Sequence, residues 1–110
     1  MKVIINNFIP VKGYIAMTMC PFIFARKELD KYVLNHENIH GEQQKELLLI
    51  IFYILYCLEY LIKLCITFNT SKAYYSISFE QEANIHEHDL DYINHRTHYN
   101  WIKYIFKVWR

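Results

Sequence analysis

The sequence lacks an excess of charge of either sign. Twelve Lys and Arg nearly balance eleven Asp and Glu, which leaves a formal net charge of +1. Because a phosphate-binding surface needs a concentrated surplus of basic residues, we expect no nucleic-acid partner. Charged residues make up only 21% of the chain and apolar residues 54%. There is therefore ample material for a core, and intrinsic disorder is excluded.

Cysteine is scarce and odd in number, and the pattern of a secretory signal is missing. Cys20, Cys57 and Cys65 lie in apolar surroundings, and the first residues do not form a basic segment followed by a continuous apolar stretch. We therefore expect reduced cysteines in a protein that is cytoplasmic or membrane-associated. Nothing resembles a linker long enough to separate two cores, so residues 1–110 are expected to form one domain.

Four consecutive segments indicate an α+β fold, a mostly helical single domain with a small N-terminal antiparallel β-sheet. The first segment, residues 1–28, is rich in β-branched and aromatic types with Pro and Gly between short runs, which indicates strands. A helical period follows from Asp30. The expected elements are strands at 2–8, 14–19 and 22–25, an active-site helix and an apolar helix within 29–68, a glutamate-bearing helix within 78–98, and a C-terminal helix within 99–110.

A long apolar run raises the question of a membrane. Residues 47–58 are twelve apolar residues in succession, fewer than the ~20 needed to cross a bilayer. Extension of the run to residue 68 takes in Glu59 and Lys63, whose spacing lets them pair on one helix face. We expect the 47–68 helix to be buried in the core. The alternative is a helix that lies in or on a membrane, together with the aromatic and basic C-terminal segment.

The strongest chemical signal is His36-Glu37-Asn38-Ile39-His40, an H-E-x-x-H motif inside the predicted helix. Residues i and i+4 share a helix face, so both imidazoles can reach one metal ion. Glu37 projects about 100° around the helix axis from His36. Its carboxylate therefore stays out of the ligand set, yet it can act as a general base towards a metal-bound water.

Two histidines do not complete a catalytic metal site, which needs a third protein ligand. Ser78 and Gln81 have the form of a capping box, which places Glu80 in the first turn of a new helix. A small residue one turn on, Ala83, allows two helices to approach closely. We therefore favour Glu80 over Glu82, which points to a different face. The plain alternative is that both are surface glutamates favoured by the helix dipole.

These residues carry a resemblance to the gluzincin family of zinc metallopeptidases. H-E-N-I-H and E-Q-E-A-N are similar to the gluzincin pattern H-E-x-x-H followed by E-x-x-A-D. From Gly13 onward the chain also resembles a family of short bacterial proteins with this motif and no assigned function. The gluzincin resemblance implies a minimal zincin-like domain in which His36, His40 and Glu80 bind zinc. It also implies that Glu37 is the catalytic base.

One position departs from the gluzincin pattern. Asn84 replaces the aspartate that would orient a ligand histidine, and Glu87, one turn beyond, could take its place. A donor to the oxyanion is expected as well. The candidates nearest in sequence to the third ligand are Tyr74, Tyr75 and His86.

We therefore expect a zinc-dependent hydrolase, a small metallopeptidase with a peptide or protein substrate. An edge strand around residues 17–24 could pair with an extended peptide beside the zinc. Two alternatives stay open: a non-catalytic domain in which zinc staples two helices, and a membrane-associated protein with another role. The remaining histidines are His86, His88, His95 and His98. We expect them to lie on a solvated polar helix end rather than to form a second metal site.

Overall fold

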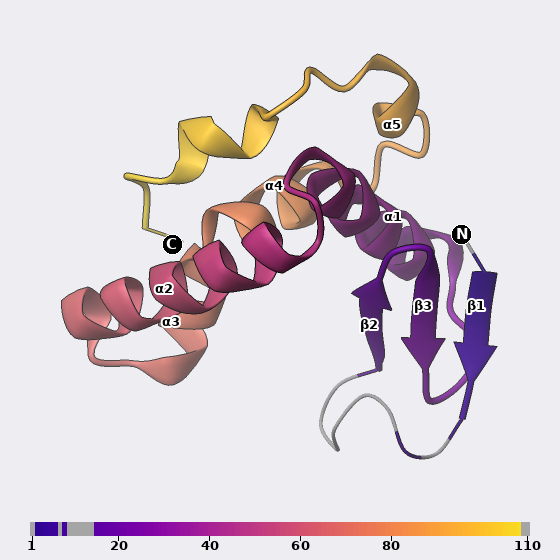
Figure 1. The fold of residues 1–110 in the computed structure, drawn as a ribbon, viewed down its shortest axis with the longest axis horizontal. Coiled ribbons are helices and arrows are strands. Elements are labelled where there is room, and N and C mark those ends of the chain that lie inside the picture. Colours follow the sequence, from indigo (N-terminus) through magenta and orange to yellow (C-terminus); the bar gives the residue numbers. More distant parts are fainter. Residues whose placement is uncertain (1, 7, 9–14, 109–110) are drawn as a thin grey trace.

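The computed structural model describes all of the chain except residues 1, 7, 9–14 and 109–110. Strands come first and helices follow (Figure 1), which confirms the expected α+β class. The described elements are β1 (Lys2–Ile5), β2 (Ala16–Met19), β3 (Phe22–Ala25), α1 (Lys31–Glu46), α2 (Ile50–Thr67), α3 (Thr70–Ser76), α4 (Ser78–His86), α5 (Tyr92–His95) and the 3₁₀-helix η1 (Asn100–Tyr104).

The sheet is mixed, with strand order β1-β3-β2. β2 and β3 pair antiparallel, whereas β1 pairs parallel to β3. The sheet thus differs from the expected antiparallel one in one pairing, because β3 lies between β1 and β2 and runs parallel to β1. Pro21 lies in the turn between β2 and β3, where its missing N–H costs no ladder hydrogen bond. β2 therefore forms one edge of the sheet, and β3 is central.

Helix α1 begins where the sequence predicts a helix. The Asp30 carboxylate caps it by accepting hydrogen bonds from the backbone N–H groups of Tyr32 and Val33, at 2.9 and 2.8 Å. Such a cap stabilises a helix by about 1 kcal/mol. Gly41 lies inside the helix and is buried. The helix ends at Glu46, and its inner face carries both histidines of the motif.

The apolar run does not continue α1 as one helix. Leu48 and Leu49 adopt positive φ angles of 54° and 57°, a left-handed conformation that costs a non-glycine residue roughly 1–2 kcal/mol. The chain changes direction there, and α2 begins at Ile50. This turn lets α2 cross in front of α4 rather than extend away from it (Figure 1).

Helix α2 is not the buried core helix that was expected. Phe52 and Lys63 are its only buried residues, and just 11% of its 18-residue span is buried. Among the described residues it is the one helix long and apolar enough to cross a membrane, with a mean hydropathy of 1.9. The expectation failed because α3 and the C-terminal segment cover only one side of α2. Glu59 and Lys63 do pair, at 3.7 Å.

The helices after α2 are shorter than the sequence predicts. α4 begins at Ser78, and Ser78 does not form a capping box, because its hydroxyl and N–H donate to the Glu59 carboxylate at 2.6 and 2.7 Å. The expected 78–98 helix ends at His86 and resumes only as α5. The expected C-terminal helix is the single 3₁₀ turn η1, and residues 109–110 lie outside the described part of the chain.

Two apolar clusters fix the helices around the motif. Phe52, Ile77, Phe79 and Trp101 join α2, α4 and η1, and the rings of Phe79 and Trp101 lie 4.6 Å apart. A second cluster joins α1, α4 and α5 through Ile39, Ala83 and Tyr92. Burial of each isoleucine or phenylalanine side chain in these clusters stabilises the fold by about 1.5–3 kcal/mol. Together they hold α4 against the face of α1 that carries the motif.

Candidate metal centre

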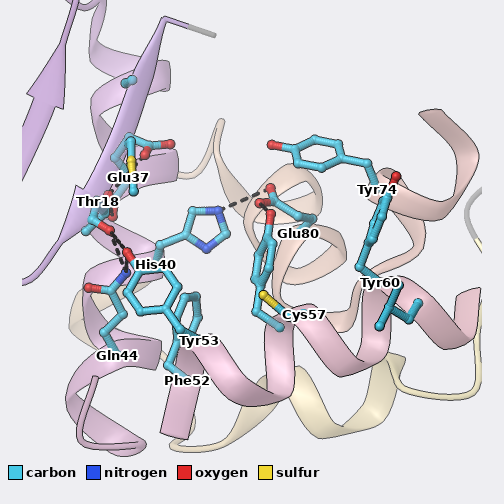
Figure 2. Close-up of a pocket in the computed structure, with 14 residues that line it drawn as sticks. Thr18, Glu37, His40, Gln44, Phe52, Tyr53, Cys57, Tyr60, Tyr74 and Glu80 are labelled. Atoms are coloured by element: carbon cyan, nitrogen blue, oxygen red, sulfur yellow. Dashed lines mark hydrogen bonds and ion pairs between the residues drawn. The ribbon is translucent and has the colours of Figure 1, made fainter. Parts of the chain in front are cut away.

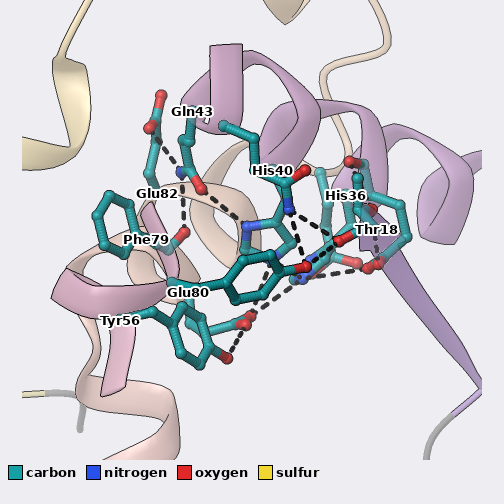
Figure 3. Close-up of polar contacts among 12 residues, drawn as sticks. Thr18, His36, His40, Gln43, Tyr56, Phe79, Glu80 and Glu82 are labelled. Atoms are coloured by element: carbon teal, nitrogen blue, oxygen red, sulfur yellow. Dashed lines mark hydrogen bonds and ion pairs between the residues drawn. The ribbon is translucent and has the colours of Figure 1, made fainter. Parts of the chain in front are cut away.

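Helix α1 places the two motif histidines one above the other, as their spacing predicts. Nε2 of His36 lies 3.2 Å from Nε2 of His40, and the two rings stand nearly edge to face. His40 is buried and His36 is half-buried. Both rings therefore turn the same nitrogen towards one point inside the fold (Figure 3).

Glu80 reaches the same point from α4. Its Oε1 lies 3.2 Å from Nε2 of His36 and 3.2 Å from Nε2 of His40. The phenol of Tyr56 on α2 donates to the other oxygen, Oε2, at 2.5 Å. Burial, and then the charge of Glu80, raises the pKa of Tyr56, so this phenol stays protonated and donating. The predicted ligand set His36, His40 and Glu80 thus comes together from two helices, α1 and α4, and Tyr56 on α2 contacts the carboxylate of Glu80.

The three converging atoms need a proton or a metal ion between them. Two imidazole lone pairs and a carboxylate oxygen at 3.2 Å from one another repel unless a proton or a metal ion is shared. Burial alone would lower the pKa of His40, but Glu80, and after it Glu37, raises that pKa to about 9. Burial alone would raise the pKa of Glu80, but His40, and after it His36, lowers that pKa. The point between the two imidazoles and the Glu80 carboxylate therefore favours a positive charge.

Gln43 fixes the tautomer of His40. Its Nε2 donates to the Phe79 carbonyl at 3.0 Å and to the Glu82 carboxylate at 2.9 Å. Its Oε1 must then accept from Nδ1 of His40, 2.8 Å away. Nδ1 therefore carries a proton, and Nε2 is the nitrogen on which a metal ion can replace a proton. The sequence analysis missed Gln43, although it stands three residues after His40 on the same helix face.

Glu82, the rejected competitor for third ligand, belongs to a separate buried ion network. Its carboxylate accepts from the guanidinium of Arg96 at 2.5 and 3.0 Å and from the phenol of Tyr92 at 2.6 Å. Arg96 also donates to Glu46 at 2.9 and 3.0 Å. Glu82 is fully buried, and these partners lower its pKa against the effect of that burial. It therefore supports Gln43 instead of facing the histidines.

Glu37 lies beside the three-atom cluster. Its Oε2 is 3.9 Å from Nε2 of His36, and the ligand atoms of His36, Glu37 and His40 all lie within 4.8 Å of one another, so this group could hold a metal ion. The hydroxyl of Thr18, on β2, lies 3.0 Å from both Oε1 and the backbone carbonyl of Glu37. The strand thus fixes the orientation of a buried carboxylate, a contact that the sequence analysis did not predict.

Of the other predicted site residues described next, only Glu87 contacts a histidine of the motif. Oε1 of Glu87 lies 3.6 Å from Nδ1 of His36, on the far side of that ring from the cluster. Nδ2 of Asn84 is buried without a hydrogen-bond partner and has no described contact with either histidine. Tyr75 is exposed, and His86 stacks on Tyr92 and contacts the Tyr104 hydroxyl at 3.3 Å. Neither Tyr75 nor His86 contacts the histidines among the described interactions.

A cleft of about 550 Å³ opens over the cluster (Figure 2). His40, Glu80 and Glu37 line it together with residues of β2 and aromatic residues of α2. Tyr74, one of the predicted oxyanion donors, is among the lining residues. The other lining residues are mainly apolar, among them Met17, Phe52, Tyr53, Cys57, Tyr60 and Leu61.

The edge strand expected at residues 17–24 is β2 alone, because β3 is central. Ala16, Met17 and Thr18 border the cleft. The carbonyl of Thr18 is already used, since the side chains of Gln44 and Tyr53 donate to it at 2.8 and 2.5 Å. Ala16 borders the cleft and comes before Thr18. Its backbone is therefore the part of this edge that we consider for peptide pairing.

Comparisons with models of known protein families, with curated proteins and with solved structures found no match to this chain.

Proposed function

We propose that this protein is a zinc-dependent hydrolase, a small metallopeptidase, in which His36, His40 and Glu80 bind zinc and Glu37 is the general base. The observation that carries the proposal is the convergence of two Nε2 atoms and one carboxylate oxygen, each 3.2 Å from the other two. Glu37 stands beside them with its carboxylate held by Thr18. The gluzincin resemblance of the sequence agrees with these roles.

The spacing of the donor atoms fits zinc. Zinc bonds to imidazole nitrogen and carboxylate oxygen are about 2.0–2.1 Å long, so two ligands of a tetrahedral shell lie roughly 3.3–3.4 Å apart. The three separations of 3.2 Å are close to the edges of one tetrahedral face. Two nitrogens and one carboxylate also form a ligand set typical of catalytic zinc. The fit requires only small movements of the side chains.

The residues of the site suit hydrolysis of an amide bond. Bound zinc would supply an acidic water and would polarise a carbonyl group. Glu37 can take a proton through Oε2, since the Thr18 hydroxyl bonds to Oε1, and can return it to the leaving amine. Tyr74 is the predicted oxyanion donor that lines the cleft. The edge of β2 at Ala16, which lines the cleft, can pair with an extended peptide.

An open cleft supports catalysis over a purely structural zinc site. Structural zinc is closed by four protein ligands, whereas a catalytic site keeps one position for water. His40, Glu80 and Glu37 border a cleft of about 550 Å³. That volume is sufficient for water and for part of a peptide chain. The apolar walls favour a substrate with large apolar side chains beside the bond that is cleaved.

Zinc stoichiometry on the purified full chain tests the metal site. We expect about one zinc per chain in the parent and in Glu37→Gln, and a loss of zinc in His40→Ala and Glu80→Gln. His98→Ala and Glu42→Gln are the matched controls, because they make the same changes at an exposed imidazole and at a carboxylate paired with Lys45. A parent chain that takes up no zinc would end the proposal.

Hydrolysis of a peptide library tests the reaction. The zinc-loaded parent should cleave peptides rich in apolar residues, and Glu37→Gln should keep its zinc but lose cleavage by about a hundredfold or more. Cleavage that persists in Glu37→Gln contradicts its role as the base. Zinc uptake without cleavage of any peptide by the parent supports the alternative, a domain that zinc only stabilises.

A further inference from the structure

The outward half of α2 is an uninterrupted apolar surface. Six of its side chains are each at least half exposed and follow one another at helical spacing. Helix α2, whose course Figure 1 shows, has 18 residues and is therefore about 27 Å long. The apolar surface extends along most of this length. Isolated exposed Ile or Leu residues need no explanation, but a continuous strip does. This outer face of α2 consists of Ile50, Ile54, Leu58, Leu61, Ile62 and Ile66.

Both charges of α2 are turned away from this face. Lys63 is buried, and its Nζ donates to the carbonyls of Ser76 and Lys107 at 2.8 and 2.6 Å. The Glu59 carboxylate accepts two hydrogen bonds from Ser78. The polar groups of the helix are therefore satisfied inside the protein, and the outer face carries no charge.

The segments that flank the outer face are basic. Glu59 is the only acidic residue in residues 47–78 and 99–108. Lys72, Lys103 and Lys107 in those segments are exposed, and Phe106 between the last two is 98% exposed. An apolar helix face whose neighbouring segments carry exposed lysines and an exposed aromatic ring is the pattern of helices that lie in the interface of an anionic bilayer.

We propose that the outer face of α2 seats the protein on the surface of an anionic lipid bilayer, with α2 parallel to the membrane plane. A spanning helix would have to be apolar on all sides, whereas the inner half of α2 carries Glu59, Lys63 and the tyrosines that line the cleft. A second copy of this chain would bring the same lysines to one interface, but anionic lipid neutralises them.

The cleft opens next to the proposed membrane surface. Leu61 belongs to the outer face of α2 and also lines the cleft, as does its neighbour Cys57. A peptide segment that lies on the bilayer would therefore meet the cleft without leaving the interface. This consequence rests on the proposed hydrolase function, whereas membrane binding does not.

Vesicle flotation of the purified full chain tests the inference. The parent should float with vesicles of phosphatidylcholine and phosphatidylglycerol, less with phosphatidylcholine alone, and less at high salt. Leu58→Glu should lower the partition coefficient about tenfold or more. Leu90→Glu is the matched control, since Leu58 is 51% and Leu90 49% exposed, and it should bind as the parent does. Glu37→Gln should also bind unchanged, which separates this test from that of hydrolysis.

The native thiols give a second readout that needs no change to the outer face. Cys57 and Cys65 are exposed on α2. In a Cys20→Ser chain, anionic vesicles should slow their reaction with a charged maleimide by about tenfold. A parent chain that stays in solution beside anionic vesicles, or equal losses in Leu58→Glu and Leu90→Glu, overturns the proposal. Thiol protection that rises with protein concentration in the absence of vesicles overturns it too, because a second copy then covers the face.

Discussion

The side-chain oxygen of Gln43 lies 2.8 Å from Nδ1 of His40, and no other arrangement of the Gln43 amide satisfies its neighbours. The amide nitrogen faces two acceptors, so the oxygen is committed to the imidazole. This contact links the ion network of Glu82 to the candidate metal centre. The orientation of the metal ligand His40 is therefore set by residues that do not reach the metal.

Loss of the Gln43 amide should weaken metal binding. We expect Gln43→Leu to lower zinc affinity about 10- to 100-fold, because Nδ1 of His40 loses its acceptor and the ring loses its fixed tautomer. Competition with a chromogenic chelator measures this affinity. Gln44→Leu is the matched control, since Gln44 is the adjacent buried glutamine and bonds to Thr18 and Cys20 instead. Equal losses of affinity in both variants would contradict the assignment.

The parts of the site that depend on local spacing could be predicted from the sequence. His36 and His40 meet because one helical turn separates them, and a helix through the motif was indicated by its apolar period. Glu80 was predicted as the third ligand from a pattern, and the structure places it against both rings. Gln43 was within reach of the same reasoning, because it is three residues from His40, but the gluzincin pattern points to Asn84 and Glu87 for the role of orienting a ligand histidine.

The parts that depend on the path of the chain could not be predicted. Tyr56 on α2 reaches Glu80 because the chain turns at Leu48 and Leu49, whereas Thr18 on β2 reaches Glu37 because β2 packs against α1. Neither leucine favours a positive φ, so the turn has no signal in the sequence. A run of apolar residues in the sequence also does not show which other elements pack against the helix that it forms. For that reason α2 was expected in the core, although half of it is exposed.

Removal of the Thr18 hydroxyl should slow catalysis without loss of metal. Thr18 is a positioning residue, since its hydroxyl contacts Glu37 and not the ligands. We expect Thr18→Val to lower kcat about tenfold, with KM and zinc stoichiometry unchanged, on the cleaved library peptides. Thr67→Val deletes a hydroxyl that bonds to the Lys63 carbonyl and should leave kcat unchanged. A similar fall in kcat for both variants would remove the positioning role.

The buried ion network should contribute strongly to stability. In Arg96→Met the carboxylates of Glu82 and Glu46 are left buried without their partner, and we expect a loss of about 3–5 kcal/mol of unfolding free energy in urea. Lys45→Met, which breaks the exposed pair with Glu42, should cost less than about 1 kcal/mol. Comparable losses in the two variants would show that the buried network is not special. Zinc affinity should also fall in Arg96→Met, because Glu82 loses the guanidinium that fixes its carboxylate beside Gln43.

Tyrosine ionisation should unfold the protein at alkaline pH. Burial, and then the hydrogen bond to Glu82, raises the pKa of Tyr92 above that of an unfolded tyrosine, which is about 10. The unfolded chain therefore loses this proton first. The contribution of Tyr92 to stability is complete below pH ~10 and is lost as the pH rises through the folded pKa.

Urea titrations between neutral pH and pH ~11 measure this effect. Above pH ~10 the unfolding free energy of the parent should fall by up to about 1.4 kcal/mol per pH unit for each such tyrosine. Tyr92→Phe should be less stable at neutral pH, because Glu82 and Asn100 lose a partner, but its stability should fall less steeply above pH ~10. Between pH 8 and 9, where tyrosine is protonated in both states, the two slopes should agree. A slope above pH ~10 that is the same in the parent and in Tyr92→Phe would mean that this phenol ionises as readily in the folded protein as in the unfolded chain.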